Sequence, residues 1–140
     1  MNLRPGRRVR TIITDPWPTP GAAANFPMAL DETHHRLFVG FRKPATLGVF
    51  ETSSGNISAN LDSTGDADDI FYDSSRQRIY IAGGEGFLDI FQQLNPDDYQ
   101  PMTKIPTAAG ARTALFVPEL DRLYVAVPHR GQPKSRSARL

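Results

Sequence analysis

The sequence contains no cysteine and no apolar run as long as a membrane-spanning helix. The first absence excludes disulfides, thiolate metal sites and cysteine nucleophiles. The second excludes a spanning helix, which needs about 20 apolar residues, so we expect no membrane association. The arginine-rich start, MNLRPGRRVRTIITDPWP, lacks the apolar stretch of a secretory signal, so we predict no signal peptide in this chain. Localisation stays unassigned, and a longer parent protein could be periplasmic or secreted.

Acidic residues are missing from both ends of the chain. Residues 1–14 and 129–140 each carry four basic side chains and no acid. The residues between them carry the other eight basic side chains against fifteen acids, a net charge of about −7. An acidic body repels a phosphate backbone, so we do not expect nucleic acid as the main partner.

Helical periodicity is absent as well, whereas turn-forming residues are plentiful. Apolar residues do not recur at the 3.6-residue spacing of an amphipathic helix. Twelve prolines and eleven glycines among 140 residues indicate many turns and short elements. The hydrophobic fraction of 39% is ordinary for a folded domain, so the sequence predicts a β-rich globular fold with a core.

One phrase occurs three times: an apolar segment, a short charged turn, and then Arg-[Leu/Ile]-[Phe/Tyr]-[Val/Ile]. Its arginines are Arg36, Arg78 and Arg122, spaced by 42 and 44 residues. Each copy predicts a β-hairpin whose second strand, being continuously apolar, is buried on both faces. We expect each arginine to bond loop carbonyls or a neighbouring repeat's acid; a ligand contact is the alternative.

Two further strands follow the first two hairpins. Thr46–Phe50 and Phe87–Phe91 are each followed by a turn and another extended segment. A period of about 43 residues with four strands is typical of a β-propeller blade. Blades stack face to face, because a single blade cannot bury both of its faces. The sequence therefore predicts an all-β fold, a partial β-propeller of four-stranded antiparallel blades.

The repeat, with LGVFET and the turn SSGN after the hairpin, resembles the YVTN repeat of YncE-like and surface-layer-like seven-bladed propellers. NHL and gluconolactonase-like propellers are more distant relatives. The resemblance covers about residues 22–128, or two and a half blades, so we expect a fragment of a longer propeller. The predicted parts are an N-terminal segment at 1–21 with a possible strand at Val9–Thr14, blades at 22–64 and 65–109, the inner half of a blade at 110–128, and a disordered basic tail at 129–140 without a further strand.

Propellers carry function where loops converge at the mouth of the central channel. Loops after the second and fourth strands of each blade share that end and form a mixed-charge group. This group is either a polar site for a small ligand, ion or peptide, or a surface that is polar only because it contacts water. The candidate ligand-binding residues are Asn25, Arg42, Asp68, Asp69, Glu85, Arg112 and His129.

Other local patterns support no catalytic or cofactor site. GDADD at 65–69 offers carboxylates for Ca²⁺ but not a complete ligand set, so we predict no tight metal site. GGEG at 83–86 leads into a strand and lacks the lysine of a phosphate loop. His34 and His35 are adjacent on a turn and should point apart, and Trp17 should pack rather than bind. No cofactor and no catalytic residue is predicted.

These patterns favour a non-catalytic propeller scaffold that binds a protein or a small ligand. A metal-assisted lactonase-like hydrolase is the alternative, and it would need three or four oxygen ligands and a general base. Single-stranded nucleic-acid binding is the second alternative. We also expect self-association through the open blade edges.

Overall fold

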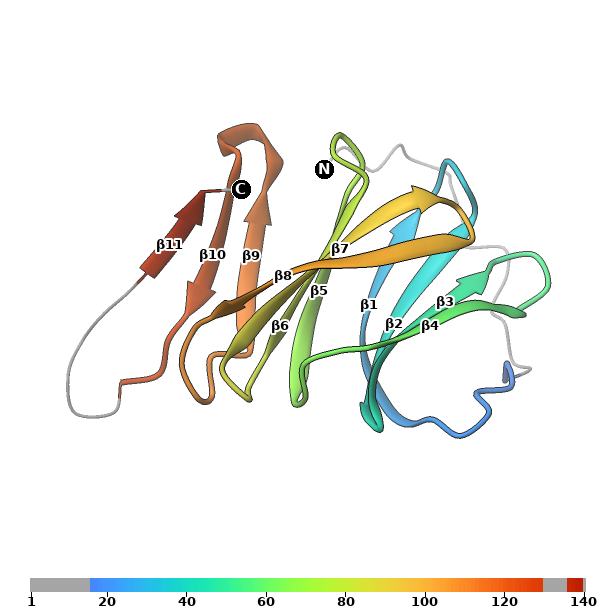
Figure 1. Cartoon of the computed structure of the whole chain (residues 1–140), viewed down its shortest axis with the longest axis horizontal. Helices are drawn as coiled ribbons and strands as arrows, with labels where there is room; N and C mark the ends of the chain where they lie inside the picture. Colours follow the sequence, from blue (N-terminus) through green and yellow to red (C-terminus); the bar gives the residue numbers. More distant parts are fainter. Residues whose placement is uncertain (1–15, 130–135, 140) are drawn as a thin grey trace, which may run out of the picture.

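The computed structural model describes residues 16–129 and 136–139. They form three antiparallel sheets that follow one another along the molecule, face against face (Figure 1). In each sheet, strands that are consecutive in the chain are neighbours. Sheet A contains β1 (Ala23–Asp31), β2 (Arg36–Lys43), β3 (Ala45–Glu51) and β4 (Ile57–Asp62); sheet B contains β5 (Ala67–Asp73), β6 (Arg78–Gly83), β7 (Phe87–Asn95) and β8 (Asp98–Pro106); sheet C contains β9 (Thr113–Val117), β10 (Arg122–Ala126) and β11 (Arg136–Arg139), with a 3-10 turn, η1 (Pro118–Leu120), between β9 and β10.

The three predicted hairpins share one turn geometry. The residue before each recurring arginine takes a left-handed conformation, with φ of 56° at His35, 53° at Gln77 and 54° at Asp121. A turn that ends in a left-handed residue is one of the common ways to close a hairpin. In the second hairpin Asp73 stabilises it, because its Oδ1 accepts bonds from the backbone N–H groups of Ser75 and Arg76.

The main core lies between sheets A and B. Phe38, Leu47 and Val49 of sheet A pack against Ile79, Ile81 and Phe91 of sheet B, all nearly inaccessible to water. The Phe38 ring lies 5.2 Å from that of Tyr72, centroid to centroid. Burying a large apolar side chain contributes about 1.5–3 kcal/mol, so this interface joins the two sheets firmly.

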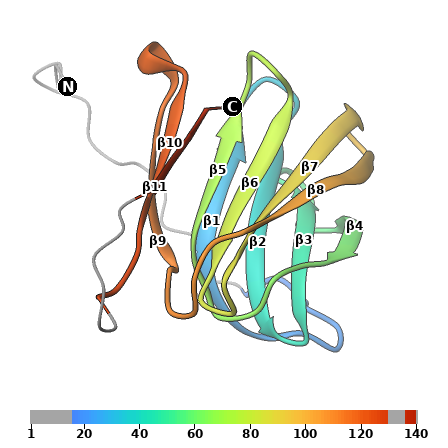
Figure 2. The same cartoon turned by 60° about the vertical axis from the view of Figure 1, so that its left-hand side comes forward.

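A second core lies between sheets B and C. Tyr80, Leu88 and Ile90 of sheet B meet Leu123 and the partly buried Phe116 of sheet C. The β6 strand thus faces both cores, with Ile79 and Ile81 on one side and Tyr80 and Ala82 on the other. Its continuous burial explains why its sequence is an uninterrupted apolar run. Figure 2 shows the sheets stacked in succession.

The structure confirms the predicted fold class: the sheets are antiparallel and packed face to face, as in a partial propeller. Residues 78–83 are a strand, and Val39, Ile79, Ile81 and Leu123 are buried. Leu37 and Val125 are only partly buried: Leu37 packs on the outer cluster of sheet A, and Val125 packs at the core between sheets B and C. The possible strand at Val9–Thr14 lies outside the described residues.

The prediction that the basic tail adds no strand and is disordered is wrong over residues 136–139. There β11 pairs with β10, with Arg122 opposite Arg139 and Val125 opposite Arg136. The far edge of β10 presents backbone N–H and C=O groups that any extended segment can bond, whatever its side chains. Basic residues therefore do not exclude a strand here. No helix among the described residues is long and apolar enough to cross a membrane.

Candidate functional site

Four loops meet at one end of the sheets. They are the β2–β3, β4–β5, β6–β7 and β8–β9 connections, at the lower end of the molecule in Figure 1. Antiparallel meanders place alternate connections at the same end. This is the end at which the sequence predicts the channel mouth.

Two arginines and two aspartates form an ion-pair cluster at this end, which we call the collar. The Asp66 carboxylate lies between the arginines, with Oδ1 3.3 Å from Arg42 Nη1 and Oδ2 3.0 Å from Arg112 Nη1. Asp68 pairs closely with Arg42 Nη2, and its other oxygen is 4.0 Å from Arg112 Nε. The collar links sheet A, sheet B and the loop leading into sheet C. Its four side chains are between 24% and 40% exposed, so it also contacts water.

Backbone conformation places the collar aspartates. Asp66 takes a left-handed φ of 55°, and its carbonyl accepts a hydrogen bond from Gly84 N–H at 2.9 Å. The β4–β5 and β6–β7 loops approach so closely that a Cβ at Gly84 would lie 2.9 Å from Asp66 Cγ, and one at Gly83 would lie 2.6 Å from the carbonyl oxygen of Gly65. The glycines of GGEG therefore serve loop packing, which agrees with the prediction of a plain turn between strands.

Asp69 and Glu85 bond to backbone rather than joining the collar. Asp69 Oδ2 accepts a 2.7 Å bond from the Ala114 N–H, which ties sheet B to sheet C. Glu85 Oε2 accepts a 2.8 Å bond from the Gly65 N–H. With Asp66 and Asp68 paired to arginines, each of these carboxylates already has a partner. Among the described residues no group of three or more histidine or acidic side chains has a metal-binding arrangement.

Of the remaining two predicted site residues, only the side chain of His129 is described, and it does not join this cluster. Asn25 lies in β1 with its backbone opposite Phe41, and its side chain is not among those that the structure describes. His129 is exposed after β10 and makes no hydrogen bond or ion pair with another described residue. Of the seven predicted residues, Arg42, Asp68 and Arg112 come together.

A buried carboxylate lies just inside this end. Asp89, on β7, is 4% exposed, and its Oδ2 accepts a 2.7 Å bond from the Thr64 N–H. The Lys104 ammonium lies 3.5 Å from the other oxygen, near the limit of a hydrogen bond. Burial raises the pKa of Asp89, and the attraction of Lys104 offsets only part of this effect.

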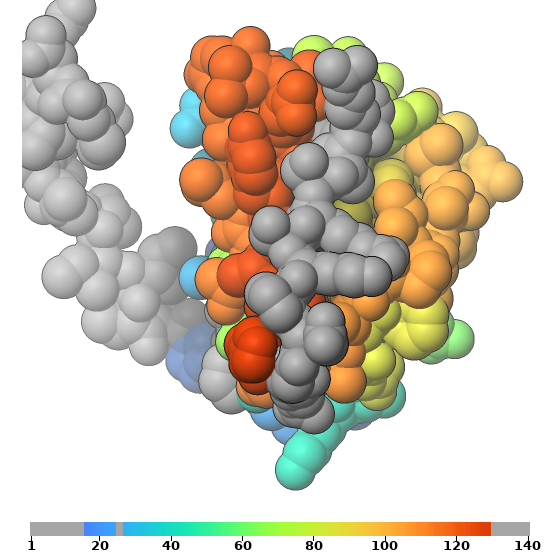
Figure 3. Space-filling model, turned by 90° about the vertical axis from the view of Figure 1, so that its left-hand side faces the viewer, coloured from blue at the N-terminus to red at the C-terminus, as the bar shows by residue number. Residues whose placement is uncertain are grey.

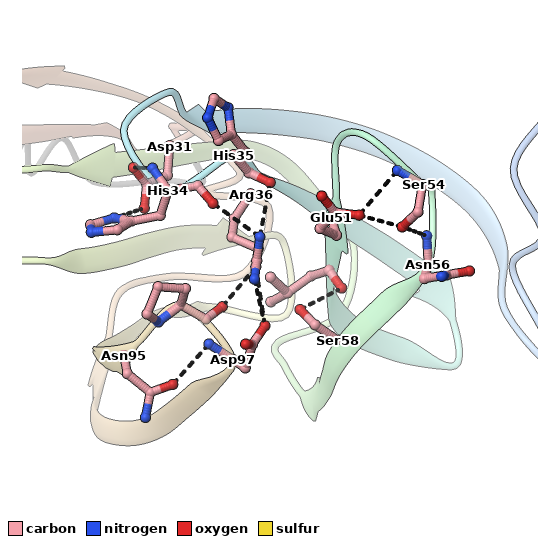
Figure 4. A network of polar contacts seen from close by, with 12 residues as sticks. Asp31, His34, His35, Arg36, Glu51, Ser54, Asn56, Ser58, Asn95 and Asp97 are labelled. Carbon is pink, nitrogen blue, oxygen red and sulfur yellow. Dashed lines mark hydrogen bonds and ion pairs between the residues drawn. The ribbon is translucent and has the colours of Figure 1, made fainter.

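The opposite end carries a second polar network, which joins sheets A and B (Figure 4). Arg36 donates from Nε to the carbonyl of Pro96 at 3.0 Å and forms a 2.8 Å ion pair with Asp97 of sheet B. This confirms for Arg36 the prediction that the recurring arginine binds a loop carbonyl and a neighbouring acid. Arg78 instead donates to Gln92 Oε1 of its own sheet at 3.2 Å.

Gln93 is the centre of a group of buried contacts at the same end, which meets the first network at Asp31. Its Nε2 donates to the buried Asp31 carboxylate at 3.0 Å and to Tyr99 Oη at 3.2 Å, while its Oε1 accepts from Tyr72 Oη at 2.7 Å. Burial raises the pKa of Asp31, but bonds from Gln93 and His34 outweigh it and hold that pKa below its usual value. His34 Nδ1 lies 2.7 Å from Asp31, whereas His35 points away from it (Figure 4), as predicted for adjacent histidines.

Two more features complete this end. Glu51 accepts hydroxyl bonds from Ser53 and Ser54 in the β3–β4 turn, and these lower its pKa to about 2. Burial raises the pKa of Tyr80 to about 12, and the Asp73 carboxylate that accepts its hydroxyl bond adds to the rise. Both are structural contacts: they close a turn and anchor a buried ring.

The candidate residues selected from the sequence do not include Asp66 or Gln93. Asp66 was one of three acids in GDADD, and only its left-handed backbone distinguishes it. Gln93 lies in the outer half of β7, and no local signal marks it. Trp17 packs as predicted, stacked 6.2 Å from Phe50 on the outer face of sheet A.

The comparisons with known proteins show the fold alone. No family model matches the chain, and no curated protein matches it. Among solved structures, it is similar to a chain of the "Crystal Structure of Mitotic Checkpoint Complex", with a TM-score of 0.66, 15% identity, and coverage of 78% of this chain and 35% of that one. It is also similar to "Kuenenia stuttgartiensis Hydrazine Synthase", with a TM-score of 0.65, 10% identity, and coverage of 83% and 32%.

Both neighbours have propeller-type folds, which supports a β-propeller-like fold for this chain. The chain spans about a third of the length of each. At identities this low the likeness carries no function, because one fold supports many functions.

Proposed function

We propose that this protein is a non-catalytic β-propeller scaffold of the YVTN-like kind, which binds a partner through the collar. The proposed relationship to YVTN-type repeats rests on the three hairpins with their recurring arginines, which share one turn geometry at His35, Gln77 and Asp121. The binding role rests on the collar.

The observation that carries the proposal is that side chains from sheet A, sheet B and the loop leading into sheet C converge on one partly exposed cluster. Arg42 comes from sheet A, Asp68 from sheet B, and Arg112 from the loop leading into sheet C. Guanidinium and carboxylate groups give strong, directional hydrogen bonds to a partner of matching charge. Arginine is enriched in protein interfaces, so a protein is the first partner to test and a small polar ligand the second.

The geometry favours the scaffold over the lactonase-like alternative. That enzyme would need several free oxygen ligands and a general base at the mouth. Here the carboxylates of Asp66 and Asp68 face arginines, and Asp69 and Glu85 accept backbone bonds. Nucleic-acid binding is disfavoured for a similar reason, since the collar arginines face carboxylates rather than forming a basic track.

The test compares two arginine variants. Arg112→Ala removes a collar side chain, and Arg122→Ala removes one at the far end of sheet C that makes no described ion pair. A protein captured from source cells with the wild-type chain is purified and titrated calorimetrically against all three forms. We expect affinity to fall at least about tenfold for Arg112→Ala and to stay unchanged for Arg122→Ala.

Equal affinity in both variants would remove the collar from the proposal. A separate assay addresses the enzyme alternative, with a simple lactone and Ca²⁺ supplied to the wild type and to Asp68→Asn. Hydrolysis that depends on Asp68 would overturn the scaffold assignment.

A further inference from the structure

The outer face of sheet C is apolar where water would favour polar side chains. Its inner face packs on sheet B through Phe116 and Leu123. The outer face presents Leu115 and Tyr124, a cross-strand pair with exposed fractions of 58% and 39%. A sheet that faces water on one side usually carries polar residues there. Figure 3 looks onto this side, where the orange atoms of β9 and β10 are visible.

The internal repeat shows what this pair does in the other sheets. Counting from the recurring arginines, Leu115 and Tyr124 correspond to the pair Phe71–Tyr80 in sheet B and to Ala29–Phe38 in sheet A. Phe38 and Tyr80 have no exposed surface, because each lies under the next sheet of the stack. The outer face of sheet C is therefore the position that a following sheet covers.

The other end of the stack has the complementary open face. On sheet A, Met28 and Leu30 are 61% and 48% exposed, and Ile57 on β4 is 45% exposed. Met28 and Leu30 correspond to Ile70 and Tyr72 of sheet B, which pack against sheet A. Trp17 covers Phe50 on this face but leaves these three side chains in contact with water.

We propose that a second copy of this chain docks head to tail, with the outer face of sheet C of one copy on the outer face of sheet A of the other. The contact repeats the one that already joins sheet A to sheet B and sheet B to sheet C. Two copies bring together six sheets, within the range of four to eight blades of closed propellers. Two identical contacts then close a ring with twofold symmetry. This proposal does not depend on the collar.

Sedimentation velocity at micromolar concentration tests the pairing. We expect a species of twice the 15.5 kDa chain mass for the wild type. Leu115→Glu and Met28→Glu each bury an unpaired carboxylate in the contact, which should weaken association about a hundredfold and give monomers. Leu94→Glu, a change of a 55% exposed leucine near the β7–β8 turn, is the matched control and should leave the dimer intact.

Mixing the two variants distinguishes head-to-tail docking from docking of like faces. The Leu115→Glu copy keeps an intact sheet A face, and the Met28→Glu copy keeps an intact sheet C face, so the mixture should form a dimer through one contact. That recovery also shows that both variants are folded. A monomeric wild type, a dimer that survives either substitution, loss of the dimer in Leu94→Glu, or no recovery on mixing would each overturn the proposal.

Discussion

Replacing Gln93 with leucine should weaken the contact between sheets A and B and lower the free energy of unfolding more than a substitution at an exposed position does. Gln93 is 2% exposed and bonds Asp31 of sheet A as well as two tyrosines of its own sheet. Leucine has a similar volume but removes one hydrogen bond from each of these partners, although Asp31 keeps its bonds from His34 and Tyr99 keeps its bond to the Pro96 carbonyl. A hydrogen bond to a charged group is worth about 1.5–3 kcal/mol and each neutral one about 1 kcal/mol. The expected loss is therefore about 3–5 kcal/mol in the free energy of unfolding.

Urea unfolding at pH 7, followed by circular dichroism, measures this loss. Gln100→Leu is the matched control, because Gln100 is exposed on β8 and its replacement should change stability by less than about 0.5 kcal/mol. Tyr72→Phe adds a second check: it should cost about 1 kcal/mol in the wild type and almost nothing in Gln93→Leu, since the bond is already lost. If Gln93→Leu costs no more than the control, the network does not join the sheets and the reasoning fails.

Two further stability predictions follow from the loop end. Because burial raises the pKa of Asp89, ionising it costs folding free energy as pH rises above the unfolded value of about 3.9. Asp89→Asn should therefore be at least as stable as the wild type at pH 7 and lose that advantage at pH 3. A variant that is less stable than the wild type at pH 7 would contradict this prediction. Gly83→Ala places a Cβ 2.6 Å from the Gly65 carbonyl oxygen and should cost about 1–3 kcal/mol, and a cost below about 0.5 kcal/mol would refute the close loop approach.

The hairpins could be predicted from the sequence because their signals are local. An apolar strand, a charged turn and an arginine before a second apolar strand specify both the pairing and the turn. In β6 the apolar run from Ile79 to Ala82 also indicates burial on both faces, which implies a sheet on either side. Stacking therefore followed from the sequence, and the structure has it.

The collar could not be predicted in full, because its members are distant in sequence. Arg42 and Arg112 lie 24 and 46 residues from Asp66. Whether two loops at the same end touch depends on how far each sheet rotates against the next, and no local pattern encodes that rotation. The sequence placed these residues at the correct end and missed that Asp66 bridges them.

The recurring arginines show how context decides a contact. Arg36 reaches Pro96 and Asp97, because the β7–β8 turn of the next sheet lies beside it. Arg78 has no counterpart of that turn in the described part of sheet C and bonds Gln92 instead. The strand β11 was missed for a different reason: its formation depends on the free edge of β10 and not on its own side chains.

The face-to-face stacking of the three sheets is tested most directly by nuclear Overhauser contacts between aromatic rings. Phe38 and Tyr72 lie on adjacent sheets with centroids 5.2 Å apart, and Tyr80 and Phe116 lie on the next pair 5.4 Å apart. We expect cross-peaks between the rings of each pair in the folded protein. Cross-strand contacts within each sheet without these two inter-sheet contacts would show that the hairpins form but do not stack, which would contradict the propeller architecture.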